Sequence, residues 1–315
     1  MFATPILFIV FNRPEETRLV FERIKQIQPK YLYIAADGPR ADRPNDKLLC
    51  AQTRKLVLDA IDWECEVRTM FRDENLGCGK AVSEGITWFF ENVEQGIILE
   101  DDCLPDLSFF SFCEEMLLYY SDNETIMHVG GNNSQFGKKR NVHSYYFSKY
   151  PHIWGWATWK RAWQKFHYEF SVNTTKDIMQ AMNYYSFDQK EIEYWSYHWE
   201  ILNSENKIDT WDIQWTFSCW LNKGISIVPN VNMISNIGFS DEATHTNQLA
   251  TILANTPTQE IKTITHPKQI IIDNSADLFT FKKYNLLEPF LLQRMRNWVS
   301  NKTPNFIKLT LKKRI

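Results

Sequence analysis

The chain has 315 residues, of which 44% are hydrophobic and 15% are aromatic, and its formal net charge at pH 7 is -3. This length and apolar content are enough to bury a sizeable core, as one large domain or as a domain with an appended subdomain. The slightly negative charge argues against a nucleic-acid-binding surface spread over the whole protein, so we expect no nucleic-acid partner.

The cysteines and the first apolar run indicate in which cellular compartment the protein is expected. The six cysteines show neither paired metal-ligand spacing nor a disulfide-like framework, which predicts reduced and mostly buried thiols. The apolar run at residues 6–11 is too short for a signal peptide or a membrane span. We therefore expect a cytoplasmic protein.

Four strand-then-helix repeats fill roughly the first hundred residues. Apolar runs predict buried strands at residues 5–11, 31–36, 66–71 and 96–99, and helical spacing follows the first three. Such repeats predict an α/β fold with a mostly parallel sheet and right-handed crossovers. Each strand ends in polar residues, which we expect to meet at one edge of the sheet around a single nucleotide. In chain order these are Arg13, Asp37, residues 72–80, and Asp101 with Asp102.

The fourth strand ends in three consecutive carboxylates, Glu100, Asp101 and Asp102. Adjacent carboxylates repel one another, and hard cations such as Mg²⁺ or Mn²⁺ bind one or two carboxylates together with substrate phosphates. The triplet thus indicates a metal–diphosphate site. For a lone triplet, a solvated turn capping the helix from Asp106 is the commoner explanation, and the surrounding pattern reverses that preference.

Glycines separate the third strand from the next helix, in Gly77-Cys78-Gly79-Lys80. Glycines before a helix N-terminus allow close backbone approach to an anion, although the spacing is not that of a P-loop. Taken alone, this stretch is weak evidence for phosphate contact.

The second half is rich in aromatic residues. We predict a helix over 106–120, a strand over 126–129, an aromatic helix or turn over 154–163, helical stretches over 191–202 and 209–222, strands within 225–237 broken at Pro229, and a polar loop over 238–247. The clustered tryptophans suit flat, partly polar ligands such as sugars, and core packing explains any single one equally well. The basic, aromatic tail over 289–315 is either a membrane-surface foot or a solvated terminal helix.

Taken together, these residues resemble a nucleotide-sugar glycosyltransferase of the GT-A fold. In the first half the resemblance is carried by Asp37, by Asn75-Leu76-Gly77 and by Glu100-Asp101-Asp102. In the second half it is carried by Gly155-Trp156, Trp211-Asp212-Ile213-Gln214-Trp215, Ile227-Val228-Pro229-Asn230 and Asn236-Ile237-Gly238. The chain is similar to bacterial nucleotide-diphospho-sugar transferases and, more distantly, to N-acetylglucosaminyltransferase I. The similarity runs from Pro5 to about Thr246.

The resemblance implies roles for individual residues. Asp212 would be the catalytic base, and Asp102 would bind Mn²⁺ or Mg²⁺ with His245 joining when its loop closes, although a loop histidine is more often a solvated surface residue. Residue 213 is isoleucine where N-acetylglucosaminyltransferase I has a second acid, so the assignment of the base depends on one carboxylate. The alternative explanation for Asp212 is an acid at a helix N-terminus that interacts with the helix dipole. The expected donor-binding residues are Asn12, Arg13, Asp37, Arg72, Asn75, Gly77, Lys80, Glu100 and Asp101, and the expected acceptor-binding residues are Trp156, Trp211 and Trp215.

The resemblance also implies a domain plan and a reaction. Residues 1–250 would form the GT-A domain, with a nucleotide-sugar-binding half at 1–130 and an acceptor half at 131–250, and residues 251–315 a C-terminal extension with a basic tail. The expected reaction is inverting transfer from a UDP-sugar, such as UDP-N-acetylglucosamine or a related hexose, to a glycan or lipid-linked acceptor in surface-polysaccharide assembly. The expected place is the cytoplasm, with peripheral contact at the inner face of the membrane.

Two other functions fit parts of the pattern. A nucleotidyltransferase that makes the sugar nucleotide would use a related scaffold, but the first strand lacks a glycine-rich, basic phosphate loop. A non-catalytic carbohydrate-binding protein would use the tryptophans for stacking and the acids to hold a structural cation.

Overall fold

The computed structural model describes residues 2–171, 174–204, 208–239 and 254–287. Its centre is an eight-stranded sheet with the strand order β3-β2-β1-β4-β8-β6-β9-β7. The strands are β1 (Ile6–Val10), β2 (Tyr31–Ala36), β3 (Glu66–Phe71), β4 (Gln95–Glu100), β6 (Ile126–Gly130), β7 (Tyr145–Ser148), β8 (Trp156–Trp159) and β9 (Ile225–Pro229). A separate two-stranded sheet pairs β5 (Cys103–Pro105) with β10 (Ile234–Asn236).

The sheet is mostly parallel. The pairs β3–β2, β2–β1, β1–β4 and β6–β9 are parallel, whereas β8 runs antiparallel to both β4 and β6, and β7 runs antiparallel to β9. The predicted α/β class with a mostly parallel central sheet is therefore confirmed. Strands from both predicted halves of the chain build this one sheet, while the proposed domain boundaries themselves stay a prediction.

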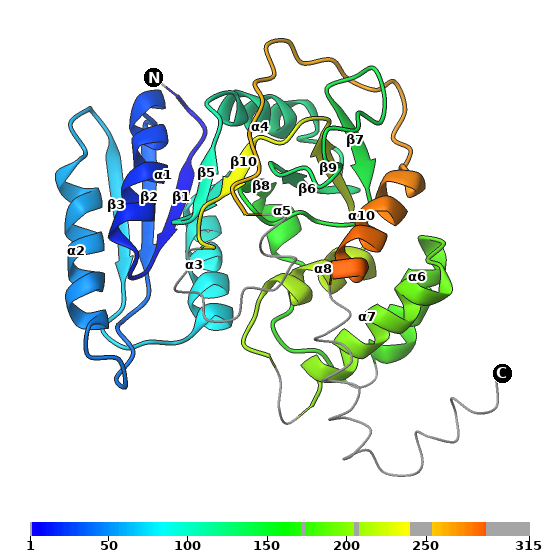
Figure 1. The fold of residues 1–315 in the computed structure, drawn as a ribbon, viewed down its shortest axis with the longest axis horizontal. Helices are drawn as coiled ribbons and strands as arrows, with labels where there is room; N and C mark the ends of the chain where they lie inside the picture. Colours follow the sequence, from blue (N-terminus) through cyan, green and yellow to red (C-terminus); the bar gives the residue numbers. More distant parts are fainter. Residues whose placement is uncertain (1, 172–173, 205–207, 240–253, 288–315) are drawn as a thin grey trace.

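Helices cover both faces of the sheet, as Figure 1 shows. They are α1 (Pro14–Ile27), α2 (Asp46–Asp59), α3 (Cys78–Asn92), α4 (Ser108–Tyr119), α5 (Lys160–Trp163), α6 (Thr175–Tyr184), α7 (Gln189–Leu202), α8 (Asp212–Leu221) and α10 (Asn274–Leu287). Alternate residues of a strand point to opposite faces. Accordingly Ile6 and Phe8 of β1 pack in the core that includes α1 and α4, and Leu7 and Ile9 pack in the core that includes α3 and α8.

One predicted element is wrong. Residues 154–163 were expected to form an aromatic helix or turn, but residues 156–159 form β8, and only the four residues of α5 are helical. Trp156 faces one core, whereas Ala157 and Trp159 face the other. A strand buried on both faces shows no polar alternation, so its sequence does not distinguish it from a buried helical turn.

The C-terminal part of the described chain, which includes α10, packs against residues 135 and 148–149. Asp277 of α10 accepts hydrogen bonds from the hydroxyl of Ser148 and, at 3.0 Å, from the backbone N–H of Lys149. Gln135 donates to the backbone oxygen of Ala276 at 3.1 Å. Across the described segments, no helix combines the length and apolar character needed to cross a membrane.

Candidate functional site

The carboxyl ends of β1 and β4 bring one arginine and three carboxylates together. Arg13 follows β1, and its Nη1 lies 2.8 Å from Oδ2 of Asp102 and 4.0 Å from Oδ1 of Asp101. Asp101 also accepts a 3.0 Å hydrogen bond from the backbone N–H of Phe11. Glu100 is the last residue of β4. Because β1 and β4 are neighbours in the sheet, their polar ends meet at one edge.

These carboxylates are electrostatically strained. Burial raises the pKa of Glu100 well above its ordinary value, and repulsion from three other carboxylates raises it further, namely Asp102, Asp101 and Asp212. Burial also raises the pKa of Asp101 to about 7, with a further contribution from Asp102. Arg13 brings a single positive charge to this group. The group thus concentrates more negative charge than its arginine balances, which favours a bound cation.

The donor set suits a cation that is shared with a substrate. The Asp102 side chain is 21% exposed, and its Oδ1 accepts only a weak 3.4 Å hydrogen bond from the thiol of Cys103 among the contacts of the described chain. A Cβ at Gly238 would lie 2.3 Å from Asp102 Oδ2, so this close approach requires glycine. In the part of the chain that the structure describes, no group of three or more His, Cys, Asp and Glu side chains is arranged to hold a metal. Mg²⁺ commonly binds one or two carboxylates and completes its shell with water and phosphate, which is the arrangement that Asp102 fits.

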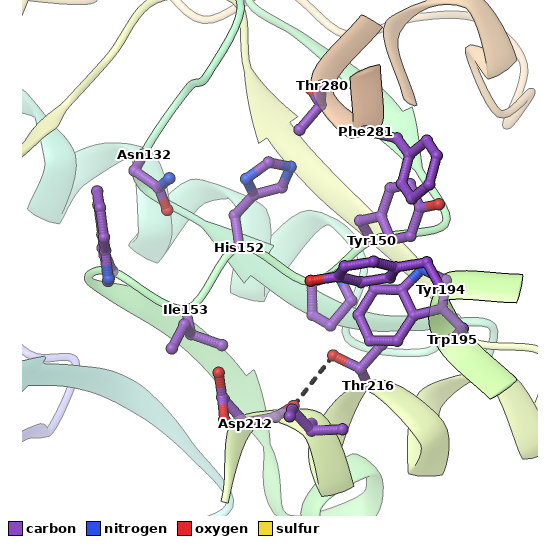
Figure 2. Close-up of a pocket in the computed structure, with 13 residues that line it drawn as sticks. Asn132, Tyr150, His152, Ile153, Tyr194, Trp195, Asp212, Thr216, Thr280 and Phe281 are labelled. Atoms are coloured by element: carbon purple, nitrogen blue, oxygen red, sulfur yellow. Dashed lines mark hydrogen bonds between the residues drawn. The ribbon is translucent and has the colours of Figure 1, made fainter. Parts of the chain in front are cut away.

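Asp212 lines a cavity and interacts electrostatically with this acidic group. It is the first residue of α8, and its carboxylate accepts a hydrogen bond from the Thr210 hydroxyl. Its repulsion contributes to the raised pKa of Glu100. It also contributes, after desolvation, Glu100 and Asp209, to raising the pKa of Cys78 to about 12. The same carboxylate lines the cavity (Figure 2). Asp212 is therefore near the strand-end acids and also accessible to a molecule in the cavity.

The cavity has a volume of ≈ 270 Å³ and mainly apolar, aromatic walls. It lies between α7, α8, α10 and the segment that leads into β8 (Figure 2). Its lining residues are Asn132, Tyr150, Pro151, His152, Ile153, Trp154, Tyr194, Trp195, Asp212, Ile213, Thr216, Thr280 and Phe281. Sequence patterns did not single out this set, because its members come from five separate stretches of the chain.

Asp37 organises the loop that follows β3. Its carboxylate accepts hydrogen bonds from Nδ2 of Asn75 at 2.8 Å and from the backbone N–H groups of Leu76 and Gly77 at 3.0 and 3.1 Å. It also accepts from the N–H of Gly38 at 2.9 Å. The structure therefore brings Asp37, Asn75 and Gly77 together, as predicted, through contacts within the protein. Their contact with a donor stays a prediction.

Other predicted donor-binding residues have protein partners as well. Asn12 donates to Oδ1 of Asp46 at 2.9 Å, and Arg72 donates to Oε2 of Glu84 at 2.7 Å. Lys80 lies in the first turn of α3. Their roles toward a nucleotide stay predictions.

The N-terminus of α3 holds a carboxylate of the chain itself, which sequence reasoning missed. Asp209 accepts hydrogen bonds from the backbone N–H groups of Cys78 at 2.9 Å and Gly79 at 2.8 Å. A Cβ at Gly77 would lie 2.3 Å from Asp209 Oδ2, and one at Gly79 would lie 2.6 Å from the Tyr168 hydroxyl. The glycines allow this approach, so the anion at the helix N-terminus is Asp209 where the sequence suggested a phosphate.

The three tryptophans predicted to bind an acceptor are core residues. Trp156, Trp211 and Trp215 are 1%, 2% and 0% exposed. Trp156 stacks on Trp211 with ring centroids 5.6 Å apart and an interplanar angle of 18°. Because their faces are covered by one another and by the protein, the prediction that they contact an acceptor is wrong. The aromatic residues that do line the cavity are Tyr150, Trp154, Tyr194, Trp195 and Phe281.

Two predictions lie outside the described residues. His245, the second expected metal ligand, belongs to residues 240–253, and the basic tail belongs to residues 288–315.

No protein family model and no curated protein matches the chain. Several solved structures are similar to it. A cytidylyltransferase from Leptospira borgpetersenii serovar Hardjo-bovis is 12% identical with a TM-score of 0.32, over 52% of this chain and 63% of the other. The galactosyltransferase LgtC, in complex with donor and acceptor sugar analogues, is 7% identical with a TM-score of 0.34, over 69% of this chain and 70% of the other. Mouse xyloside xylosyltransferase 1 is 10% identical with a TM-score of 0.34, over 69% of this chain and 81% of the other.

The chain thus spans less than two thirds of the cytidylyltransferase it matches. These identities and TM-scores are too low to support an argument about activity. The function therefore has to be inferred from the residues and geometry of the chain itself.

Proposed function

We propose that the protein is a metal-dependent, inverting glycosyltransferase that transfers a sugar from a UDP-sugar to a glycan or lipid-linked acceptor. One observation carries this proposal: Asp212 lines the aromatic cavity and also lies close enough to Glu100, at the end of β4, to raise its pKa. A carboxylate so placed can take a proton from a hydroxyl in the cavity. The acidic group beside it suits a cation with a diphosphate.

The protein's own residues account for the binding and proton steps. Asp102 would hold Mn²⁺ or Mg²⁺, which supplies charge stabilisation to the diphosphate as it leaves. Arg13, next to Asp102, adds a positive charge at the same place. Asp212 accepts the proton of the attacking sugar hydroxyl. Among the described residues that line the cavity Asp212 is the only carboxylate, which supports a single base and inversion at the anomeric carbon.

UDP-N-acetylglucosamine or a related hexose donor, surface-polysaccharide assembly, and peripheral membrane contact through the basic tail are parts of the same proposal. They are supported by the sequence resemblance. A nucleotidyl transfer on this scaffold would differ in releasing pyrophosphate, and a carbohydrate-binding protein would not cleave a donor.

Two substitutions test the proposal. The wild type is screened against nucleotide sugars with Mn²⁺, by thermal stabilisation and by release of UDP. Asp102→Asn should lose the Mn²⁺-dependent stabilisation by UDP. Asp212→Asn should keep that stabilisation and lose transfer, with the exposed Asp122→Asn as the matched control. Transfer by Asp212→Asn at the wild-type rate would refute the assignment of the base. Pyrophosphate release from UTP and a sugar 1-phosphate would refute glycosyl transfer.

A further inference from the structure

The cavity beside Asp212 has no positive charge in its described walls. Its thirteen lining residues include one carboxylate and no lysine or arginine. Lys149 directly precedes the lining residue Tyr150, but its ammonium is paired with Glu191 at 2.9 Å from Oε1. Each of these two side chains is 2% exposed. An anion entering the cavity would lose water, meet the charge of Asp212 and find no counter-charge, which makes its burial costly.

The aromatic rings of the cavity are held in place by one another. Trp195 stacks on Tyr150 with ring centroids 5.9 Å apart, and Tyr194 meets Phe281 edge-on at 5.6 Å. The hydroxyl of Tyr150 donates a hydrogen bond to Glu191, which holds that ring in place. Figure 2 shows these rings gathered on one side of the cavity. Rigid aromatic faces give an apolar ligand surface a place to pack without ordering flexible side chains.

An unsatisfied acceptor also lines the cavity. Asn132 is 5% exposed, and its buried Oδ1 has no hydrogen-bond partner among the residues that the structure describes. Burying an acceptor without a partner is unfavourable, so a ligand that brings a donor to it recovers part of that cost. Asn132 lies on a different part of the wall from Asp212 (Figure 2). The cavity wall therefore includes the Asp212 carboxylate, the Asn132 side chain and an apolar side, which suit a ligand that carries hydroxyl donors and an apolar face.

We propose that this cavity binds one uncharged sugar ring, the terminal residue of the acceptor, and discriminates against acidic sugars. The ring packs its apolar face on Tyr194, Trp195 and Phe281, and the reacting hydroxyl donates to Asp212. A second hydroxyl donates to Asn132 Oδ1 once that side chain turns toward the cavity. The volume of ≈ 270 Å³ lies just below the roughly 300–1,000 Å³ that is usual for ligand pockets, which suits one ring and not an extended chain. This inference rests on the proposed function.

Matched pairs of methyl glycosides test it, each a neutral hexoside and its uronic acid counterpart, together with the corresponding 2-amino sugar. Binding to the full chain is measured by ligand-observed NMR at pH 7.5 in Mn²⁺ and UDP, without a sugar donor. For at least one pair, the neutral member should bind at least about tenfold more tightly than the acid, a difference of about 1.4 kcal/mol. Tighter binding of the acid, or binding of no glycoside, overturns the proposal, and the amino sugar serves as the control of opposite charge.

Two variants locate the site. Ile153→Lys places an ammonium in the wall and should shift the preference toward the uronic acid, whereas Ile153→Leu should keep the neutral preference. Asn132→Ala should weaken the neutral glycoside about tenfold without lowering the melting temperature, since it removes an acceptor that has no partner. Unchanged preferences in Ile153→Lys, with a wild-type melting temperature, contradict the assignment to this cavity.

The outcomes separate this inference from the proposed function. If neutral glycosides bind as expected and no nucleotide sugar is used, the cavity assignment stands and the transferase proposal fails. If sugar is transferred and uronic acids bind as tightly as their neutral partners, the cavity assignment fails alone.

Discussion

Replacing Lys149 by methionine should destabilise the protein strongly. Lys149 and Glu191 are each 2% exposed, and Nζ and Oε1 lie 2.9 Å apart. The ammonium also lies 4.0 Å from the ring centroid of Phe187, and the backbone oxygen of Lys149 accepts from the indole N–H of Trp220 at 2.6 Å. Methionine keeps the length of the side chain and removes its charge. Glu191 is then left buried with its charge uncompensated.

Breaking a buried pair from one side costs about 3–5 kcal/mol, whereas an exposed pair is worth ~0–1 kcal/mol. The matched control is Lys55→Met, since Lys55 pairs with Asp59 in α2 and both side chains are mostly exposed. At about 2–4 °C per kcal/mol, Lys149→Met should lower the melting temperature by ~10 °C and Lys55→Met by no more than ~3 °C.

Urea denaturation measures these costs for Lys149→Met, for Glu191→Met and for the double variant Lys149→Met/Glu191→Met. The double variant should be less destabilised than the sum of the two singles, because it removes both charges together. Glu191 also belongs to a capping box with Asp188, and Glu191→Gln keeps an acceptor there and should cost less than Glu191→Met. Equal stability losses in Lys149→Met and Lys55→Met would refute the reasoning.

Three more predictions concern helix α3, a buried histidine and the strand-end acids. Asp209→Ala should cost about 1–2 kcal/mol in urea unfolding, because two N–H groups at the start of α3 lose their acceptor, and Asp209→Asn should cost less; no loss in either would exclude the cap. Burial lowers the pKa of His128 from 6.5 to about 3, and its ring accepts from the Trp215 indole N–H at 3.2 Å. The unfolded chain therefore binds more protons than the folded chain below pH 6.5, so the free energy of unfolding should fall from pH 6.5 toward pH 4. The fall should be steeper than in His128→Gln by up to ~1.4 kcal/mol per pH unit. Equal slopes of the free energy of unfolding against pH would show that His128 is not the source. Arg13→Met should bind Mn²⁺ roughly threefold more tightly, because it frees a carboxylate oxygen in an acidic group, and titration showing weaker binding would contradict this.

The first half of the fold could be predicted because its signals are local. Continuous apolar runs mark β1, β2 and β4, and polar residues mark where each ends. Parallel strands joined by right-handed crossovers place those ends at one edge, which brought Arg13 to Asp102 as expected. The strand β8 was mistaken for a helix or turn because it is buried on both faces and its period does not show.

Contacts between distant parts of the chain gave no such signal. Asp209 and Gly79 are 130 residues apart, so a glycine pair before a helix looked the same whether its anion was a phosphate or a carboxylate of the chain. Trp156 and Trp215 were taken for a sugar-binding surface because composition reports how many aromatic residues are present and not which faces are covered.

The sequence by itself determined the α/β class, the positions of the first four strands along the chain and the acidic group at the end of β4, since each follows from neighbouring residues and the geometry of a parallel sheet. Only the tertiary structure decided which aromatic residues line a cavity, that Asp212 lies on its wall near Glu100, and that Asn132 Oδ1 has no partner within the described segments. The physical reason is that exposure and hydrogen-bond satisfaction depend on all the surrounding segments at once, and five separate stretches of the chain meet at this cavity.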